Sequence, residues 1–276
     1  MSPEQQMGLG SFLPTESSKP RTGLVTLLFT DIVSSTALKQ QLGDKAGAAL
    51  MQQQRVLVRQ LLAACPGAEE IETAGDSFLL SFPKPSDAVR FALILQARLQ
   101  LLNQAQAVPL QERIGIHLGE VVIEEHSAGL KPKDLYGIQL DACARVMSLA
   151  KGNQVLMSRG VFDNARQVLK GEDIEGVGQL EWLNHGPYLL KGLDEPVEIC
   201  EVREADQEHA PGPPTASEKA QRQVRPDEEP VLGWRPAVGT VVPSTQWVLE
   251  KKLGEGGFGE VFPLHGVPNI ERERIG

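Results

Sequence analysis

The sequence predicts an α+β sandwich, ferredoxin-like in its core, in which helices flank a mixed and largely antiparallel sheet. Three observations support this class. The expected elements follow the order β-α-β-β-α-β-β-α-β, neighbouring strands form hairpin patterns, and several smaller extended segments come last. Since strands joined by tight turns pair antiparallel, this order favours an α+β fold over a doubly wound parallel sheet.

The first strand and the first helical region come before residue 65. Residues 24–29 form a continuous apolar run that is long enough for a buried strand and too short for a helix. Residues 34–64 are rich in Ala, Leu, Gln and Arg, which favours a helix. Because Gly43 and Gly47 interrupt this region, it is either one helix or a broken pair.

A hairpin and a long helix are expected next. Two apolar segments, 69–74 and 77–82, flank a Gly-Asp dipeptide at 75–76, which is typical of a tight turn. Pro85 is a favoured first residue of a helix, and a continuous stripe of Ala, Leu, Ile and Phe extends this helix to about Asn103.

A second hairpin is expected around Gly119. Residues 113–117 and 120–125 alternate in hydropathy on either side of it, and residues 126–134 are expected to form a loop. A helix over 138–150 then ends where Lys-Gly closes it. After it we expect a strand at 154–157 and three short extended pieces, near 178–183, 187–190 and 196–202.

Composition divides the chain into four parts. Residues 1–21 are polar and rich in proline, which predicts a disordered N-terminus. Residues 22–203 carry all the elements above. Residues 204–246 are rich in Pro, Glu, Gln, Ser and Arg and poor in aliphatic side chains, which is typical of a linker. A new apolar pattern begins in the last part, 247–276.

Charge and cysteine usage narrow the class of protein. The net charge of -9 disfavours non-specific nucleic-acid binding, which needs clustered cations, but a local metal site still permits a nucleotide ligand. Three widely spaced cysteines disfavour a disulfide framework or a zinc site. The N-terminal residues lack the basic and apolar regions of a signal peptide, so none is expected, and the apolar runs are far shorter than the roughly 20 residues of a membrane helix. We therefore expect a soluble, cytoplasmic protein without membrane or nucleic-acid partners.

Asp31 is the first candidate for a metal ligand. It follows the strand in LLFTDIVSST and precedes small hydroxyl residues that open a helix. A carboxylate there suits a hard cation, and the free N–H groups of residues 32–36, including those of Ser34, Ser35 and Thr36, suit phosphate oxygens. The alternative is that Asp31 only caps the helix.

Asp76 is the second candidate, at the tip of the first hairpin. A hairpin tip beside the end of the first strand would bring Asp76 close to Asp31, and a pair of Mg²⁺ ions would compensate two close carboxylates. The alternative is that Gly-Asp is ordinary turn chemistry.

Four segments together resemble the class III adenylyl/guanylyl cyclase family. They are LLFTDIVSST, then IETAGDSFLLSF, then RIGIHLGEV and DLYGIQLDACARVMSLA, in the order and spacing of that family. The resemblance makes 22–203 a nucleotidyl cyclase domain. It implies that Asp31, Ile32 and Asp76 bind two metal ions, Mg²⁺ or Mn²⁺. It also implies a head-to-tail homodimer that converts a nucleoside triphosphate into a 3′,5′-cyclic nucleotide and pyrophosphate in intracellular signalling.

The resemblance places base selection at Glu72 and Asp134, and here the two positions conflict. Glu at the first is usual in guanylyl cyclases, whereas Asp at the second is common in adenylyl cyclases. Both side chains accept hydrogen bonds when ionised, so either purine leaves one mismatch, which costs about 1–3 kcal/mol. We expect ATP, with GTP as the other option. The alternatives are an exposed strand carboxylate for Glu72 and a loop cap for Asp134.

Further site residues follow from the same resemblance. Arg145 matches the family's transition-state arginine, and Lys191 in GPYLLKGL matches its triphosphate lysine. Asp141 stands where the family has asparagine, and it would repel a polyanion. The alternative for Asp141 is an ordinary i, i+4 ion pair with Arg145, and for Lys191 an exposed turn lysine.

The last part of the chain resembles the start of a serine/threonine protein kinase domain. LGEGGFGEV matches the glycine-rich loop that covers ATP phosphates, but the later kinase motifs are absent from the sequence. We expect a truncated kinase fragment over 247–276 without kinase activity. The alternative function is accordingly a catalytically weak cyclase-homology module that dimerises and regulates a kinase.

Overall fold

The computed structural model describes residues 20–126, 133–205, 214 and 219–223, and the backbone of four short strands between Trp247 and Gly266. The chain divides into two compact units, Met1–Gln223 and Val224–Gly276. The predicted disordered N-terminus, apart from its last two residues, lies outside the described residues, as does most of the predicted linker.

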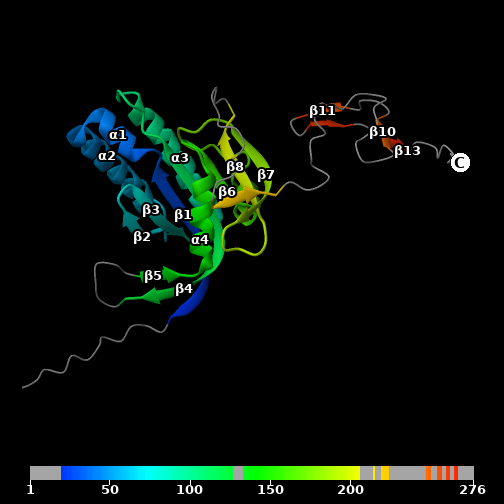
Figure 1. The fold of residues 1–276 in the computed structure, drawn as a ribbon, viewed down its shortest axis with the longest axis horizontal. Coiled ribbons are helices and arrows are strands. Elements are labelled where there is room, and N and C mark those ends of the chain that lie inside the picture. Colours follow the sequence, from blue (N-terminus) through cyan, green and yellow to red (C-terminus); the bar gives the residue numbers. More distant parts are fainter. Residues whose placement is uncertain are drawn as a thin grey trace, which may run out of the picture. The chain divides into compact units, whose positions relative to one another are not determined.

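One mixed sheet forms the centre of the first unit (Figure 1). Its strands lie in the order β2-β3-β1-β4-β6-β8-β7-β9, and β5 pairs with β4 beyond that path. The β4–β6 pair is parallel and the other pairs are antiparallel. The strands are β1 (Arg21–Ile32), β2 (Glu69–Ala74), β3 (Ser77–Phe82), β4 (Glu112–Glu125), β5 (Lys133–Tyr136), β6 (Val155–Ser158), β7 (Leu180–Leu190), β8 (Val197–Glu204) and β9 (Ala220–Arg222).

Helices cover both faces of this sheet, so the predicted α+β class is confirmed. Successive residues of a strand point to opposite faces. Leu28 of β1 packs in the large core with α2, α3 and α5, whereas Leu27 packs in a separate core with Cys143 of α4. The helices are α1 (Ser35–Leu42), α2 (Asp44–Ala63), α3 (Pro85–Asn103), α4 (Ile138–Leu149) and α5 (Arg159–Leu169).

The first half of the predicted element order is confirmed. The hairpin strands β2 and β3 and the helix α3 have the predicted bounds. The region 34–64 is a broken pair rather than one helix. Gly43 separates α1 from α2 with φ of 79°, a left-handed value that favours glycine.

The predicted second hairpin is wrong. Residues 113–117 and 120–125 belong to one continuous strand, β4, and Gly119 lies within it. A Cβ at Gly119 would approach the Gln139 Cβ to 2.6 Å, so glycine here permits close packing of α4 against the strand. The hairpin partner of β4 is β5, which begins at Lys133 and therefore takes in the end of the predicted loop; residues 127–132 lie outside the described residues.

Helix α5 was not predicted. Its buried residues are spaced as on one helical face: Val161, Phe162, Ala165 and Leu169. Two of the three predicted extended pieces merge into the single strand β7, and the third is β8. No helix in the described residues is long and apolar enough to cross a membrane.

The second unit contains two small sheets. Strand β10 (Trp247–Leu249) pairs with β13 (Leu264–Gly266), and β11 (Gly254–Gly256) pairs with β12 (Gly259–Val261). The β11–β12 hairpin lies in the glycine-rich motif. A kinase fragment remains a prediction.

Candidate metal and nucleotide site

Asp31 lies near the end of β1, between β3 and β4, and neighbouring side chains fix its carboxylate. Ser77 Oγ donates a hydrogen bond of 2.7 Å to Asp31 Oδ1. Arg113 donates from Nη2 and Nε to Asp31 Oδ2, at 2.6 and 3.1 Å. The guanidinium therefore balances the carboxylate charge and sets its orientation. The alternative role of helix cap is wrong, because the residue at the N-cap of α1 is Ser34.

Asp76 lies at the turn between β2 and β3, at the same end of the sheet as Asp31. Gly75 adopts a left-handed φ of 66°, and Arg55 of α2 donates two hydrogen bonds to the Gly75 carbonyl. Asp76 precedes Ser77, whose hydroxyl contacts Asp31. Asp76 Oδ2 is buried and accepts no hydrogen bond from the described residues. A buried carboxylate oxygen without a donor is costly, so a cation at this position would compensate it.

The donor set at this end of the sheet fits a hard divalent cation. Carboxylate oxygens are the ligands that Mg²⁺ prefers, and a Mg²⁺ site commonly takes only one or two of them together with substrate phosphates. Among the described residues, no group of three or more His, Cys, Asp and Glu side chains is arranged so that it could hold a metal ion. Further ligands would therefore be backbone oxygens, such as that of Ile32, and oxygens of a bound nucleotide.

The start of α1 follows directly from β1 and is suited to an anion. Ser34 has φ of 56° and ψ of 38°, a left-handed conformation that costs a non-glycine residue roughly 1–2 kcal/mol. No side chain caps the helix, and the first α-helical backbone bond runs from Leu38 N to Ser34 O. The amides of Ser35 and Thr36 precede that bond, so they remain available to a phosphate group.

The two candidates for base selection lie on strands that contact each other. Glu72 is exposed on β2, after an irregularity in its pairing with β3. Asp134 lies on β5, and its Oδ2 is 2.9 Å from Nε2 of His126. Lys133, next to Asp134, forms an ion pair with Glu69 of β2. The structure therefore brings β2 and β5 together, as a shared purine site requires.

Arg145, Asp141 and Lys191 form a second group, on α4 and just after β7. Arg145 Nε donates to the Lys191 carbonyl at 2.6 Å, and Arg145 Nη2 lies 3.8 Å from Asp141 Oδ1. The i, i+4 pair is therefore present but long, and the Asp141 side chain is 67% exposed. Within the described residues, no hydrogen bond or ion pair links this group to Asp31 or Asp76. The described residues thus hold two separate groups of candidate site residues.

Sequence reasoning missed Glu112, a buried carboxyl on the opposite face of the sheet from Asp31. Thr30 Oγ1 donates to its Oε1, and Gln54 Nε2 lies 3.0 and 3.1 Å from its two oxygens. Burial raises the pKa of Glu112 from 4.5 to about 7 against the effect of these hydrogen bonds, and the nearby charges of Asp31 and Asp76 raise it further. Arg113 was also missed, although it begins the RIGIH motif.

Glu112 should make the stability of the folded chain depend on pH. Because its pKa is raised in the folded state, the folded chain keeps a proton that the unfolded chain loses between pH 4.5 and about 7. Stability therefore falls as pH rises through this window, by about 3 kcal/mol in total. Glu112→Gln keeps a hydrogen-bonding oxygen but cannot ionise, so it should abolish the loss of stability between low and high pH. Urea unfolding at pH 5 and pH 8, at one protein concentration, measures it; equal pH dependence in both proteins would contradict this account.

Comparisons with known proteins agree with this geometry. The family model described as "Adenylate and Guanylate cyclase catalytic domain" matches residues 17–198. The chain is 31% identical over 222 residues to the receptor-type adenylate cyclase GRESAG 4.3 of Trypanosoma brucei brucei, covering 67% of this chain but only 17% of that protein. The chain thus spans about a sixth of this relative's length.

Solved structures resemble the chain over about two thirds of its length. Adenylate cyclases from Trypanosoma brucei in their monomeric state are 28% identical, with a TM-score of 0.53, covering 65% of this chain and 89% of theirs. The adenylyl cyclase CyaB from P. aeruginosa has a TM-score of 0.56 at 17% identity, covering 70% of this chain and all of its own, which supports the fold alone.

Proposed function

The chain belongs to the family of adenylate and guanylate cyclase catalytic domains, and on that basis we propose that residues 22–203 convert ATP or GTP into a 3′,5′-cyclic nucleotide and pyrophosphate. The observation that carries the proposal is the pair of carboxylates at one end of the sheet. Asp31 is fixed by Ser77 and Arg113, and Asp76 at the same end of the sheet has a buried oxygen without a donor among the described residues.

Asp31 and Asp76 would hold two divalent cations, Mg²⁺ or Mn²⁺, with the Ile32 carbonyl as a further ligand. The chemistry that such ions supply is a lowered pKa of the ribose 3′-hydroxyl and neutralisation of charge on the triphosphate. The chain's own contribution is positioning. The amides of Ser34, Ser35 and Thr36 would bind phosphate oxygens.

Arg145 and Lys191 would act on the phosphates from the other half of the site. The Lys191 carbonyl holds the Arg145 guanidinium in place, so the cation is oriented before charge develops on the α-phosphate. The Lys191 side chain is exposed and would bind the triphosphate. Because these residues share no bond with Asp31 or Asp76 in the described chain, we propose that a second copy supplies them.

An uncovered apolar surface supports a head-to-tail homodimer. Val122 of β4 lies opposite Tyr136 of β5 and, on its other side, opposite Thr22 of β1. Leu24 is two residues further along β1, so its side chain points to the same face of the sheet as that of Thr22. Leu24, Val122 and Tyr136 therefore point to one face of the sheet, and all three are exposed, Leu24 by 69%. Uncovered apolar side chains on one strand face are typical of a protein interface.

Purine choice within the proposed site depends on Glu72 and Asp134. Both side chains accept hydrogen bonds when ionised. Each purine therefore has one mismatch, because adenine N1 and guanine O6 are also acceptors: adenine N1 would face Glu72, and guanine O6 would face Asp134. His126 Nε2 lies 2.9 Å from Asp134 Oδ2, and an ionised Asp134 would accept a hydrogen bond from the adenine amino group. This arrangement favours ATP.

A product assay with the full chain tests the proposal. ATP and GTP are each supplied with Mg²⁺ or Mn²⁺ at several protein concentrations, and cyclic nucleotide and pyrophosphate are measured. We expect cyclic AMP as the main product, with a rate per chain that rises with protein concentration as dimers form. If a folded, dimeric chain forms no product from either nucleotide with either metal, the proposed cyclase activity is refuted.

Asp141 motivates a second candidate, a weakly catalytic dimerisation module that regulates a kinase. Nucleotide binding without turnover, together with dimerisation, would favour this candidate over the enzyme. Its structural basis is a carboxylate beside Arg145, where it reduces the positive charge offered to the phosphates.

Asp141→Asn is expected to raise kcat about 3- to 10-fold. The change removes one negative charge near the polyphosphate, worth about 1 kcal/mol at a solvated position, and adds a donor. The matched control is Asp163→Asn, which removes an exposed i, i+4 partner of Arg159 on α5 and should leave kcat unchanged. Initial rates at saturating nucleotide check both; an Asp141→Asn rate equal to or below that of the parent would contradict this role.

A further inference from the structure

Strand β9 adds an edge to the sheet from within the range predicted as a linker. Its residues pair antiparallel with the end of β7, with Leu190 opposite Ala220 and Tyr188 opposite Arg222. Two backbone bonds extend the pairing, from Lys191 N to Lys219 O at 2.8 Å and from Gln223 N to Pro187 O at 2.9 Å. The family match ends at residue 198, so β9 lies outside it.

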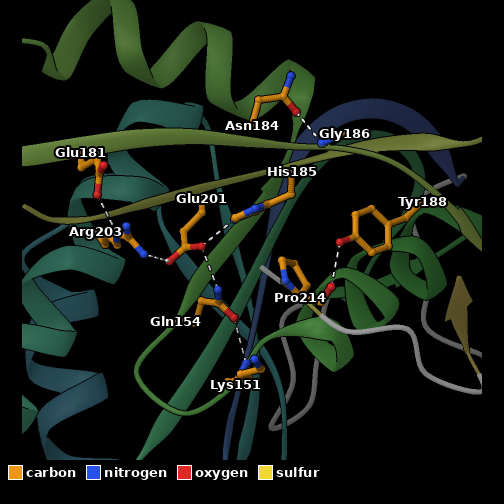
Figure 2. A network of polar contacts seen from close by, with 10 residues as sticks. All are labelled: Lys151, Gln154, Glu181, Asn184, His185, Gly186, Tyr188, Glu201, Arg203 and Pro214. Carbon is orange, nitrogen blue, oxygen red and sulfur yellow. Dashed lines mark hydrogen bonds and ion pairs between the residues drawn. The ribbon is translucent and has the colours of Figure 1, made fainter. Parts of the chain in front are cut away.

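Core packing as well as backbone pairing holds this segment. Ala220 is 2% exposed and lies in one apolar cluster with Val146 and Leu149 of α4 and Leu190 of β7. The Tyr188 ring is fully buried, and its hydroxyl donates a hydrogen bond of 2.8 Å to the Pro214 carbonyl (Figure 2). The segment therefore contacts both α4 and β7, which carry the second group of site residues.

The Lys191 backbone is held on both sides. Its N–H donates to Lys219 O next to β9, and its carbonyl accepts from Arg145 Nε. Two consecutive hydrogen bonds thus run from the β9 segment to the Arg145 guanidinium. A shift of β9 would move the carbonyl that orients Arg145, and a misplacement of about 1 Å in a catalytic group costs up to roughly 100-fold in rate.

We propose that β9 is a positioning strand for Arg145, acting through the backbone of Lys191. The proposal rests on the proposed function, because it gives Arg145 its role in turnover. Ala220, Gln221 and Lys219 are positioning residues in this scheme and do not touch substrate.

The first test needs no activity. Gln221 is exposed on β9, so Gln221→Pro removes a strand N–H without altering the core, and Gln221→Ala keeps that N–H as the matched control. By NMR of the full chain, the Lys191 amide and the Arg145 Nε–H should exchange about 10-fold faster or more in Gln221→Pro. In Gln221→Pro, exchange of the β4 amides should not change. In Gln221→Ala, exchange at the Lys191 amide and at the Arg145 Nε–H should equal that of the parent chain. Unchanged exchange at Arg145 Nε–H would overturn the proposal.

If Gln221→Pro does not fold, Tyr188→Phe tests the same link more gently. The ring stays in the core and only the hydrogen bond to Pro214 is lost, so exchange at both positions should rise about fivefold. Exchange at Arg145 Nε–H equal to that of the parent would again overturn the proposal.

The second test is a double-mutant cycle on turnover. Gln221→Pro should lower kcat about 10- to 100-fold with little change in KM, but should have no further effect in an Arg145→Ala background. Equal effects in both backgrounds would show that β9 does not act through Arg145. If the parent chain forms no product, the proposed function fails, and the exchange experiment alone decides whether β9 positions Arg145.

Discussion

Asp31→Asn should lower kcat for cyclic nucleotide formation by about 1,000-fold or more, since the metal chemistry that it would lose is worth several kcal/mol. The asparagine keeps the size of the side chain and one oxygen, which can still accept from Ser77. It presents an amide in place of the charged oxygen that Arg113 now contacts. The change therefore removes a proposed metal ligand and leaves Arg113 without its counter-charge.

The measurement is kcat with Mn²⁺ and with Mg²⁺, together with Mn²⁺ affinity by calorimetry. Asp87→Asn is the matched control, because Asp87 also pairs with an arginine, Arg90, but lies on α3 away from the site. The control should keep its rate, and both variants should stay folded by circular dichroism. A folded Asp31→Asn chain that keeps a tenth of the parent rate would contradict the metal role.

Arg145→Ala should lower kcat about 100- to 1,000-fold and change KM little, the loss expected when one preorganised donor to a transition state is removed. The arginine is held by the Lys191 carbonyl before substrate arrives, so its charge needs no reorganisation during the reaction. We expect its effect on ground-state binding to be smaller than its effect on turnover, because additional charge develops on the α-phosphate only in the transition state.

Steady-state kinetics over a range of nucleotide concentrations separates the two parameters. Arg159→Ala is the control, since Arg159 forms exposed ion pairs on α5 and has no proposed role. Arg145→Lys should be faster than Arg145→Ala but slower than the parent chain. Lysine lacks the planar guanidinium that can donate to the Lys191 carbonyl and to a phosphate at the same time. A raised KM with an unchanged kcat would assign Arg145 to binding instead of transition-state stabilisation.

Local signals predicted some elements to the residue. The β2–β3 hairpin depends on the Gly-Asp turn at 75–76, and α3 begins at Pro85, so neighbouring residues determine both. Gly119 was misinterpreted because a glycine that admits a packed helix looks the same in sequence as a glycine in a turn. Strand β9 has three residues in a polar region, and only its partner β7 makes it a strand.

The candidate site likewise divides into residues that local motifs reveal and residues that only tertiary contacts reveal. Their motifs make Asp31 and Asp76 candidate metal ligands, and the structure brings both to one end of the sheet. Glu112 and Arg113 were missed because their partners lie about 80 residues away along the chain, on a neighbouring strand whose register the sequence does not reveal. The bond from Arg145 to Lys191 is likewise a tertiary contact that no local pattern predicts.

Mixing two inactive variants tests the central claim, a cyclase site shared between two copies of the chain. In a head-to-tail homodimer, a chain with Asp31→Asn still supplies Arg145, and a chain with Arg145→Ala still supplies Asp31. Each variant alone should be inactive, whereas their mixture should regain about a quarter of the parent rate, because random pairing restores one site in half of the dimers. A mixture that exchanges subunits but is no more active than the separate variants, beside an active parent chain, would contradict the shared site.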